Sequence, residues 1–117
     1  MIDTRNEAGP RGGPALAGGG TERVFPVTGI CGVPEDATAV SLNVTVADAT
    51  GTGVLRLYPG DGIPSSSSAI EFRPARNRAN NAMVYVATDG SGTFAVRNDV
   101  KAGSTVHLVV DVNGYYR

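Results

Sequence analysis

Few side chains in this sequence are of the types that catalyse reactions. His107 is the one histidine, and Asp111 follows it four residues later in an apolar, β-branched run. On one strand this spacing puts both side chains on the same face but about 13 Å apart, too far for a catalytic dyad. No serine sits in a nucleophile-elbow pattern, and Cys31, the only cysteine, excludes an intrachain disulfide. We therefore expect no catalytic residues and no enzymatic activity.

The carboxylates that could contribute to a metal site are spread along the chain, at Asp61, Asp89, Asp99 and Asp111. Calcium takes several oxygen ligands, and the sequences around Asp61 and Asp89 carry too few carboxylates for an EF-hand loop. Ligand spacing typical of a transition-metal site is absent. We expect no metal and no cofactor, and a composite structural calcium site stays open as the alternative.

Ligand binding without catalysis has better candidates, which are Tyr58, Tyr85, Tyr115, Tyr116 and Asn43. Sugar-binding β-sandwiches present exposed aromatic rings, most often tryptophan, and this chain has no tryptophan. Tyrosines also suit the edge of a core, where the ring is buried and the hydroxyl finds a partner. Asn43 belongs to a polar stripe on a strand. This stripe could bind sugar, and we favour the alternatives that it faces solvent or is hydrogen-bonded to the N-terminal arm.

The first 22 residues are rich in glycine, proline and alanine, and we interpret residues 1–22 as an irregular arm. Asp3 and Arg5 would point to the same side of an extended arm. They could form half of a ligand site. We expect instead that they are the structural anchor that holds the arm on the rest of the domain.

From residue 23 onward the sequence pattern predicts short strands, which are separated by residues typical of turns. Residues 38–48 alternate strictly between apolar and polar side chains, and no segment shows a convincing helical period. Seven to eight short strands predict an all-β fold, an antiparallel and jelly-roll-like β-sandwich over residues 23–117, with the arm as part of the same domain. The predicted core comprises Val40, Leu42, Val44, Val46, Ile70, Phe72, Val84, Val86, Leu108 and Val110.

Charge and hydropathy exclude two classes of partner. The net charge is −1, and nucleic-acid binding needs a concentrated basic surface. No apolar stretch approaches the roughly 20 residues of a membrane-spanning helix. We expect no nucleic-acid partner and no membrane insertion.

Three motifs, in this order, carry a family resemblance. They are Ile2-Asp3-Thr4-Arg5, the segment from Gly32 to Val46, and the C-terminal segment from Val106 to Tyr116, which contains Val-Asp-Val-Asn-Gly-Tyr. Together they resemble a recurring all-β accessory module of secreted actinobacterial and myxobacterial proteins. The resemblance implies a bacterial domain appended to extracellular or cell-surface proteins, and it implies no catalytic residues.

Two functions fit this picture. The first is a structural or protein-interaction module, which docks to its parent protein or assembles with other copies of itself. The alternative is a carbohydrate-binding module for cell-wall or substrate polysaccharide. A structural module predicts a self-complementary surface without an aromatic platform. A carbohydrate-binding module predicts two or more exposed tyrosines beside polar groups.

Overall fold

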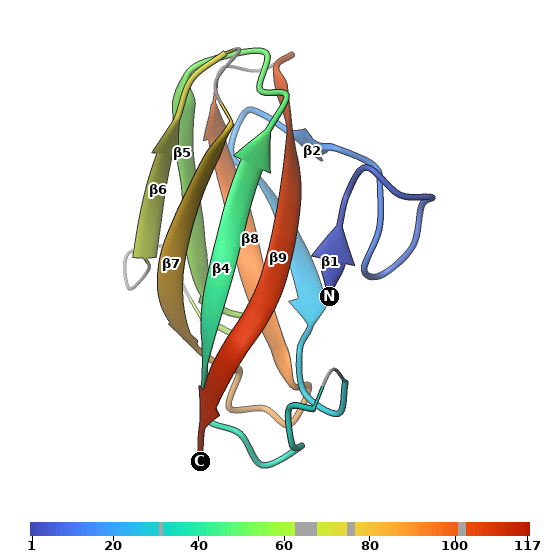
Figure 1. Ribbon diagram of the computed structural model, residues 1–117, viewed down its shortest axis with the longest axis vertical. Helices are drawn as coiled ribbons and strands as arrows, with labels where there is room; N and C mark the ends of the chain where they lie inside the picture. The colour runs from blue at the N-terminus through green and yellow to red at the C-terminus, as the bar shows by residue number, and fades with distance from the viewer. Residues whose placement is uncertain (31, 63–67, 75–76, 101–102) are drawn as a thin grey trace.

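The chain folds into a β-sandwich of two antiparallel sheets (Figure 1). A computed structural model describes residues 1–30, 32–62, 68–74, 77–100 and 103–117. No helix occurs within these ranges, so none of the described residues belongs to a helix long and apolar enough to cross a membrane. The predicted all-β sandwich is confirmed.

The first sheet has the strand order β1-β9-β4-β7, and β2 pairs with a second stretch of β9. All of these pairings are antiparallel. Its strands are β1 (Ile2–Asp3), β2 (Leu16–Ala17), β4 (Ala39–Ala47), β7 (Arg78–Tyr85) and β9 (Thr105–Tyr116). Figure 1 looks onto the outer face of β7, β4 and β9.

The second sheet lies behind the first in Figure 1, in the order β3-β8-β5-β6. Its pairings are also antiparallel. Its strands are β3 (Thr21–Pro26), β5 (Gly53–Pro59), β6 (Ser68–Phe72) and β8 (Thr93–Val100).

The core fills the space between the two sheets. All ten residues of the predicted core are buried, and Val40, Leu42, Val44 and Val46 of β4 have no exposed surface. Successive side chains of a strand point to opposite faces, so the strict alternation in β4 delivers every second residue to the core. The apolar residues of the alternating pattern are therefore the residues that pack between the two sheets.

Nine strands form among the described residues, against the seven to eight expected, because the arm itself contains two of them. Ile2 of β1 pairs with Val110, and Leu16 of β2 pairs with Val106, all four being buried. The arm therefore covers the outer edge of β9, where unpaired backbone groups would otherwise invite another chain.

Arg23 holds the loop of the arm between β1 and β2. Its guanidinium lies 4.7 Å from the centre of the Phe25 ring. The same group donates hydrogen bonds of 2.6–3.1 Å to the backbone carbonyls of Gly9, Gly12, Gly13 and Pro14. One arginine thus binds four carbonyls of the loop, of which those of Gly9 and Gly13 also accept backbone hydrogen bonds within the loop.

Candidate binding face

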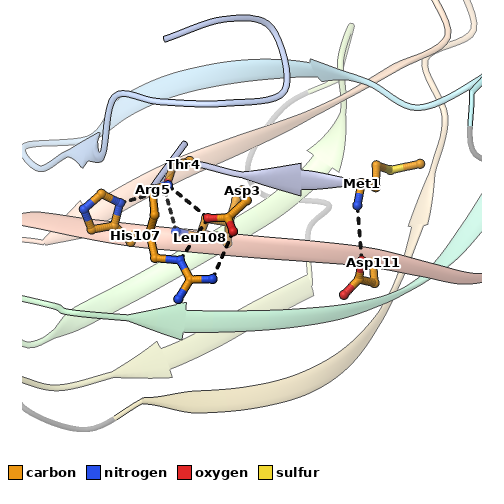
Figure 2. A network of polar contacts seen from close by, with 7 residues as sticks. All are labelled: Met1, Asp3, Thr4, Arg5, His107, Leu108 and Asp111. Carbon is orange, nitrogen blue, oxygen red and sulfur yellow. Dashed lines mark hydrogen bonds and ion pairs between the residues drawn. The ribbon is translucent and has the colours of Figure 1, made fainter. Parts of the chain in front are cut away.

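The side chain of His107 contacts the arm (Figure 2). Its Nδ1 lies 3.0 Å from Thr4 Oγ1, which also accepts a 2.8 Å hydrogen bond from the backbone N–H of Leu108. Asp111 pairs with the α-ammonium group of Met1 at 3.2 Å. His107 and Asp111 thus contact different groups, as their spacing on one strand predicts, and His107 helps to seat the arm.

Asp3 and Arg5 pair with each other at the surface. Arg5 donates to both carboxylate oxygens of Asp3 from its side chain, at 2.9 and 3.0 Å, and donates a third bond from its backbone N–H. These hydrogen bonds lower the pKa of Asp3 from 3.8 to about 2. The pair closes a local turn. The backbone of Asp3 is opposite Val109 of β9, and the hydrogen bonds with Leu108 of β9 come from Thr4.

The four aspartates that were candidate calcium ligands lie apart, and each has contacts of its own. Among the described residues, no three histidine, cysteine or carboxylate side chains lie close enough together to hold a metal ion. The partners are Thr88 for Asp61, Ser91 for Asp89, Arg56 and Arg97 for Asp99, and the N-terminus for Asp111.

The four candidate tyrosines occupy three different environments. Tyr58, on β5, is only 1% exposed, and its hydroxyl donates a hydrogen bond to the Glu22 carboxylate. Burial and this hydrogen bond raise the pKa of the Tyr58 hydroxyl. A buried ring cannot stack on a ligand, so Tyr58 lies outside any binding surface.

Tyr115 and Tyr116 are neighbours on β9 and therefore point to opposite faces of the sheet. Tyr115 is opposite Val40, a core-facing residue, and the guanidinium of Arg117 lies 5.8 Å from its ring centre. Tyr116 is opposite Ala39, which faces outward. Of the two, Tyr116 belongs to the outer face.

Tyr85 and Tyr116 lie on either side of Ala39 and share that outer face. Ala39 pairs with Tyr85 of β7 on one side and with Tyr116 of β9 on the other. Residues directly opposite each other on paired strands project from the same face. The tyrosines are 65% and 54% exposed, whereas Ala39 between them is 3% exposed. Two rings therefore flank one small covered residue.

Polar side chains follow along the same face. The next row across the sheet contains Met83, Ser41 and Gly114, and the row after it contains Asn81, Asn43 and Asp111. We call these three rows, from Tyr85–Ala39–Tyr116 to Asn81–Asn43–Asp111, the tyrosine face. Asn43, the polar candidate from the sequence, lies in the middle of the last row. The face has hydrogen-bonding groups beside two aromatic rings and carries no lysine or arginine.

A hollow of about 470 Å³ opens beside Tyr85 at the end of the sandwich. Ala37, Pro59, Val86 and Ala87 give it apolar walls, and Thr38, Asp61 and Thr88 add polar groups. The Oδ2 atom of Asp61 accepts hydrogen bonds from the backbone N–H and the hydroxyl of Thr88, at 3.0 and 2.8 Å. These bonds fix the orientation of the carboxylate.

Two smaller hollows, of about 230 and 290 Å³, lie at the other end of β7. Arg73 and Arg78 line both of them. Their chemistry differs from that of the tyrosine face, because they present cationic groups in place of aromatic rings.

Sequence reasoning missed Asn81, Met83 and the hollow. No signal in the sequence marks Asn81 or Met83 as neighbours of Asn43 or Ser41, because the register of β4 against β7 decides which residues adjoin. The tyrosine face combines flat apolar area with amide and carboxylate groups, which suits a ligand that has both apolar ring faces and hydroxyl groups.

Comparison with models of known protein families finds no match to this chain, and no curated protein is significantly similar to it. The resemblance to an accessory module of secreted proteins stays a prediction from the sequence motifs.

Proposed function

We propose that this chain is a non-catalytic carbohydrate-binding module of an extracellular or cell-surface bacterial protein. Its binding surface is the tyrosine face. The observation that carries the proposal is the placement of Tyr85 and Tyr116, both exposed, on one sheet face. Ser41 lies in the next row of that face, and Asn43 lies in the row after it, about 13 Å from the tyrosine row.

The physical chemistry of this face fits a sugar polymer. A pyranose ring has an apolar face of C–H groups, which packs on an aromatic ring, and a rim of hydroxyls that need hydrogen-bond partners. Tyrosine supplies a rigid ring with a polar tip. Asn43 and Asn81 each carry one amide acceptor and two amide donors, and Asp111 adds acceptors. The face thus offers both kinds of contact within three neighbouring strands.

The experiment is a binding assay with purified protein and insoluble polysaccharides, including cellulose, chitin and purified cell wall. We expect the double variant Tyr85→Ala with Tyr116→Ala to bind at least about tenfold more weakly than the natural chain, a loss of about 1.4 kcal/mol or more. Val24→Ala is the matched control, because Val24 is 43% exposed on β3 of the other sheet. Absence of binding to every polysaccharide, or equal loss in the control, would overturn the proposal.

A protein-interaction module is the second candidate, favoured by a different observation. Strand β7 ends the order of its sheet, and no strand of the described residues pairs with its outer edge, so a strand from a partner or a second copy could pair there. Met83 and Tyr85, both on β7, add exposed apolar surface next to that edge. Sedimentation at high micromolar concentration separates the candidates: a dimer abolished by the double tyrosine variant would favour this second function.

A further inference from the structure

We infer that the ligand of the tyrosine face is an uncharged, extended, β-linked polysaccharide of N-acetylated hexosamines. It crosses the strands from Tyr116 to Tyr85 and places an acetamido group in the hollow beside Tyr85. This inference rests on the proposed function and adds the class of polysaccharide and its direction on the sheet.

The direction of the polysaccharide on the sheet follows from the register of β7 and β9 against β4. Tyr85 and Tyr116 are both opposite Ala39, so the line joining them runs across the strands. Strands in a sheet lie about 4.8 Å apart, which separates the two tyrosine backbones by about 10 Å. That distance is close to the length of two sugar units in an extended β-linked chain. The two rings can therefore stack on alternate units.

The hollow beside Tyr85 indicates which substituent the sugar units carry. Its volume of about 470 Å³ falls within the range of small-ligand sites and can hold a whole sugar unit. An acetamido group carries a methyl group, which packs on Val86 and Ala87. It also carries an amide N–H, for which the oriented Asp61 carboxylate is an acceptor. A plain hydroxyl in the same place would leave the apolar walls in contact with water.

The charge of the site argues against anionic polymers. Asp111 lies on the tyrosine face and Asp61 lines the hollow, while neither the three rows of the face nor the lining of the hollow contains a lysine or arginine. A polymer of uronic acids or phosphodiesters would meet the carboxylate of Asp61 in the hollow, which is unfavourable, whereas the carboxylate of Asp111 is already paired with the α-ammonium group of Met1. An uncharged polymer meets no such repulsion.

The test compares soluble chito-oligosaccharides with cello-oligosaccharides of equal length by isothermal titration calorimetry. The two series share the β-linkage and differ in the acetamido group. We expect the natural chain to bind the acetylated series at least about tenfold more tightly. We expect Asp61→Ala to remove that preference, and the double tyrosine variant to weaken binding to both series.

The outcomes distinguish this inference from the proposed function. Equal affinity of the natural chain for both series, with a loss in the double tyrosine variant, would overturn the inference and leave the proposed function standing. Binding to neither series or to any insoluble polysaccharide would overturn both. An Asp61→Ala variant that keeps the full preference for the acetylated series would show that the hollow does not bind the acetamido group. Because Asp61 is exposed, this variant is expected to fold.

Discussion

Replacing Thr4 with valine removes one hydroxyl group and keeps the shape of the side chain. The hydroxyl oxygen accepts a buried hydrogen bond of 2.8 Å from the backbone N–H of Leu108, at the gap between the two stretches of β9 that pair with β1 and β2. It thus replaces the carbonyl that a continuous neighbouring strand would provide. The backbone N–H of Thr4, which donates to the Leu108 carbonyl, is unchanged by the substitution.

The cost of this substitution can be worked out along two routes. If the arm stays in place, a buried N–H loses its only acceptor, which costs about 1–3 kcal/mol. If the arm lifts away so that water reaches Leu108, the fully buried Ile2 becomes exposed, at about 1.5–3 kcal/mol. The hydrogen bond between Thr4 and His107 is only partly buried, so water replaces it at little cost. Both routes give about 2 kcal/mol.

The assay is urea unfolding, and Thr4→Ser is the matched control. With a denaturant slope of about 1–3 kcal/mol per molar, we expect the midpoint of Thr4→Val to fall by about 1 M. Serine keeps the hydroxyl and loses one methyl group, which costs about 0.8 kcal/mol. A serine variant as unstable as the valine variant, or more so, would refute the role of the hydroxyl.

Three further substitutions test the core, the surface ion pair and a turn. Phe72→Ala, at a side chain only 2% exposed, is expected to lower the free energy of unfolding by about 3–5 kcal/mol; a loss below about 1 kcal/mol in urea unfolding would contradict its placement in the core. Asp3 has a folded-state pKa lowered by Arg5, so the stability that this carboxylate contributes is complete above 3.8 and is lost as the pH falls to about 2. The melting temperature of the natural chain should accordingly converge on that of Asp3→Asn across this window, and a constant gap would contradict the pairing. Gly92→Ala is expected to destabilise the fold by about 1–3 kcal/mol, because φ is +65° and the added Cβ would collide with the Thr28 side chain; an unchanged thermal midpoint would show that the turn relaxes freely.

Local pattern was sufficient to predict the central strand. The alternation over residues 38–48 predicts β4 to within one residue at each end, because one face of that strand is wholly apolar. No such alternation marks the start of β7 at Arg78. Asn80 and Asn81 have low intrinsic preference for strands. Their pairing with Val44 and Asn43, far away in sequence, keeps them extended.

The strands of the arm were beyond sequence reasoning for a related reason. A two-residue segment such as Ile2–Asp3 has no periodicity to detect, and its partners Val109 and Val110 lie at the other end of the chain. The family-like motif at the N-terminus drew attention to Asp3 and Arg5, whose charges are conspicuous. Thr4, between them, makes the buried contact. Its hydroxyl has no distinctive sequence signature.

A β-bulge decides which tyrosine joins the candidate site. The register of β9 against β4 shifts between Ser41 and Leu42, so that Leu42 pairs with Val112 and Ser41 with Gly114. Each residue added to a strand reverses the face on which all later side chains lie. Without the bulge, Tyr115 would continue the outward row of Asp111 and Tyr116 would turn inward. Both tyrosines are candidates from the sequence, and the register of β9 against β4 decides which of them lies on the outer face.

The tyrosines on the two outer faces of the sandwich differ in burial. On the face of the second sheet, Tyr58 is buried and bonded to Glu22, while Asp99 bridges Arg56 and Arg97. The side chains of that face satisfy one another, and the ring contributes to stability through its burial. Exposing Tyr85 and Tyr116 on the opposite face forgoes that contribution. Stability therefore gives no reason for two exposed rings in one row, whereas contact with a ligand does, since exposed apolar area on a soluble domain commonly marks a binding surface.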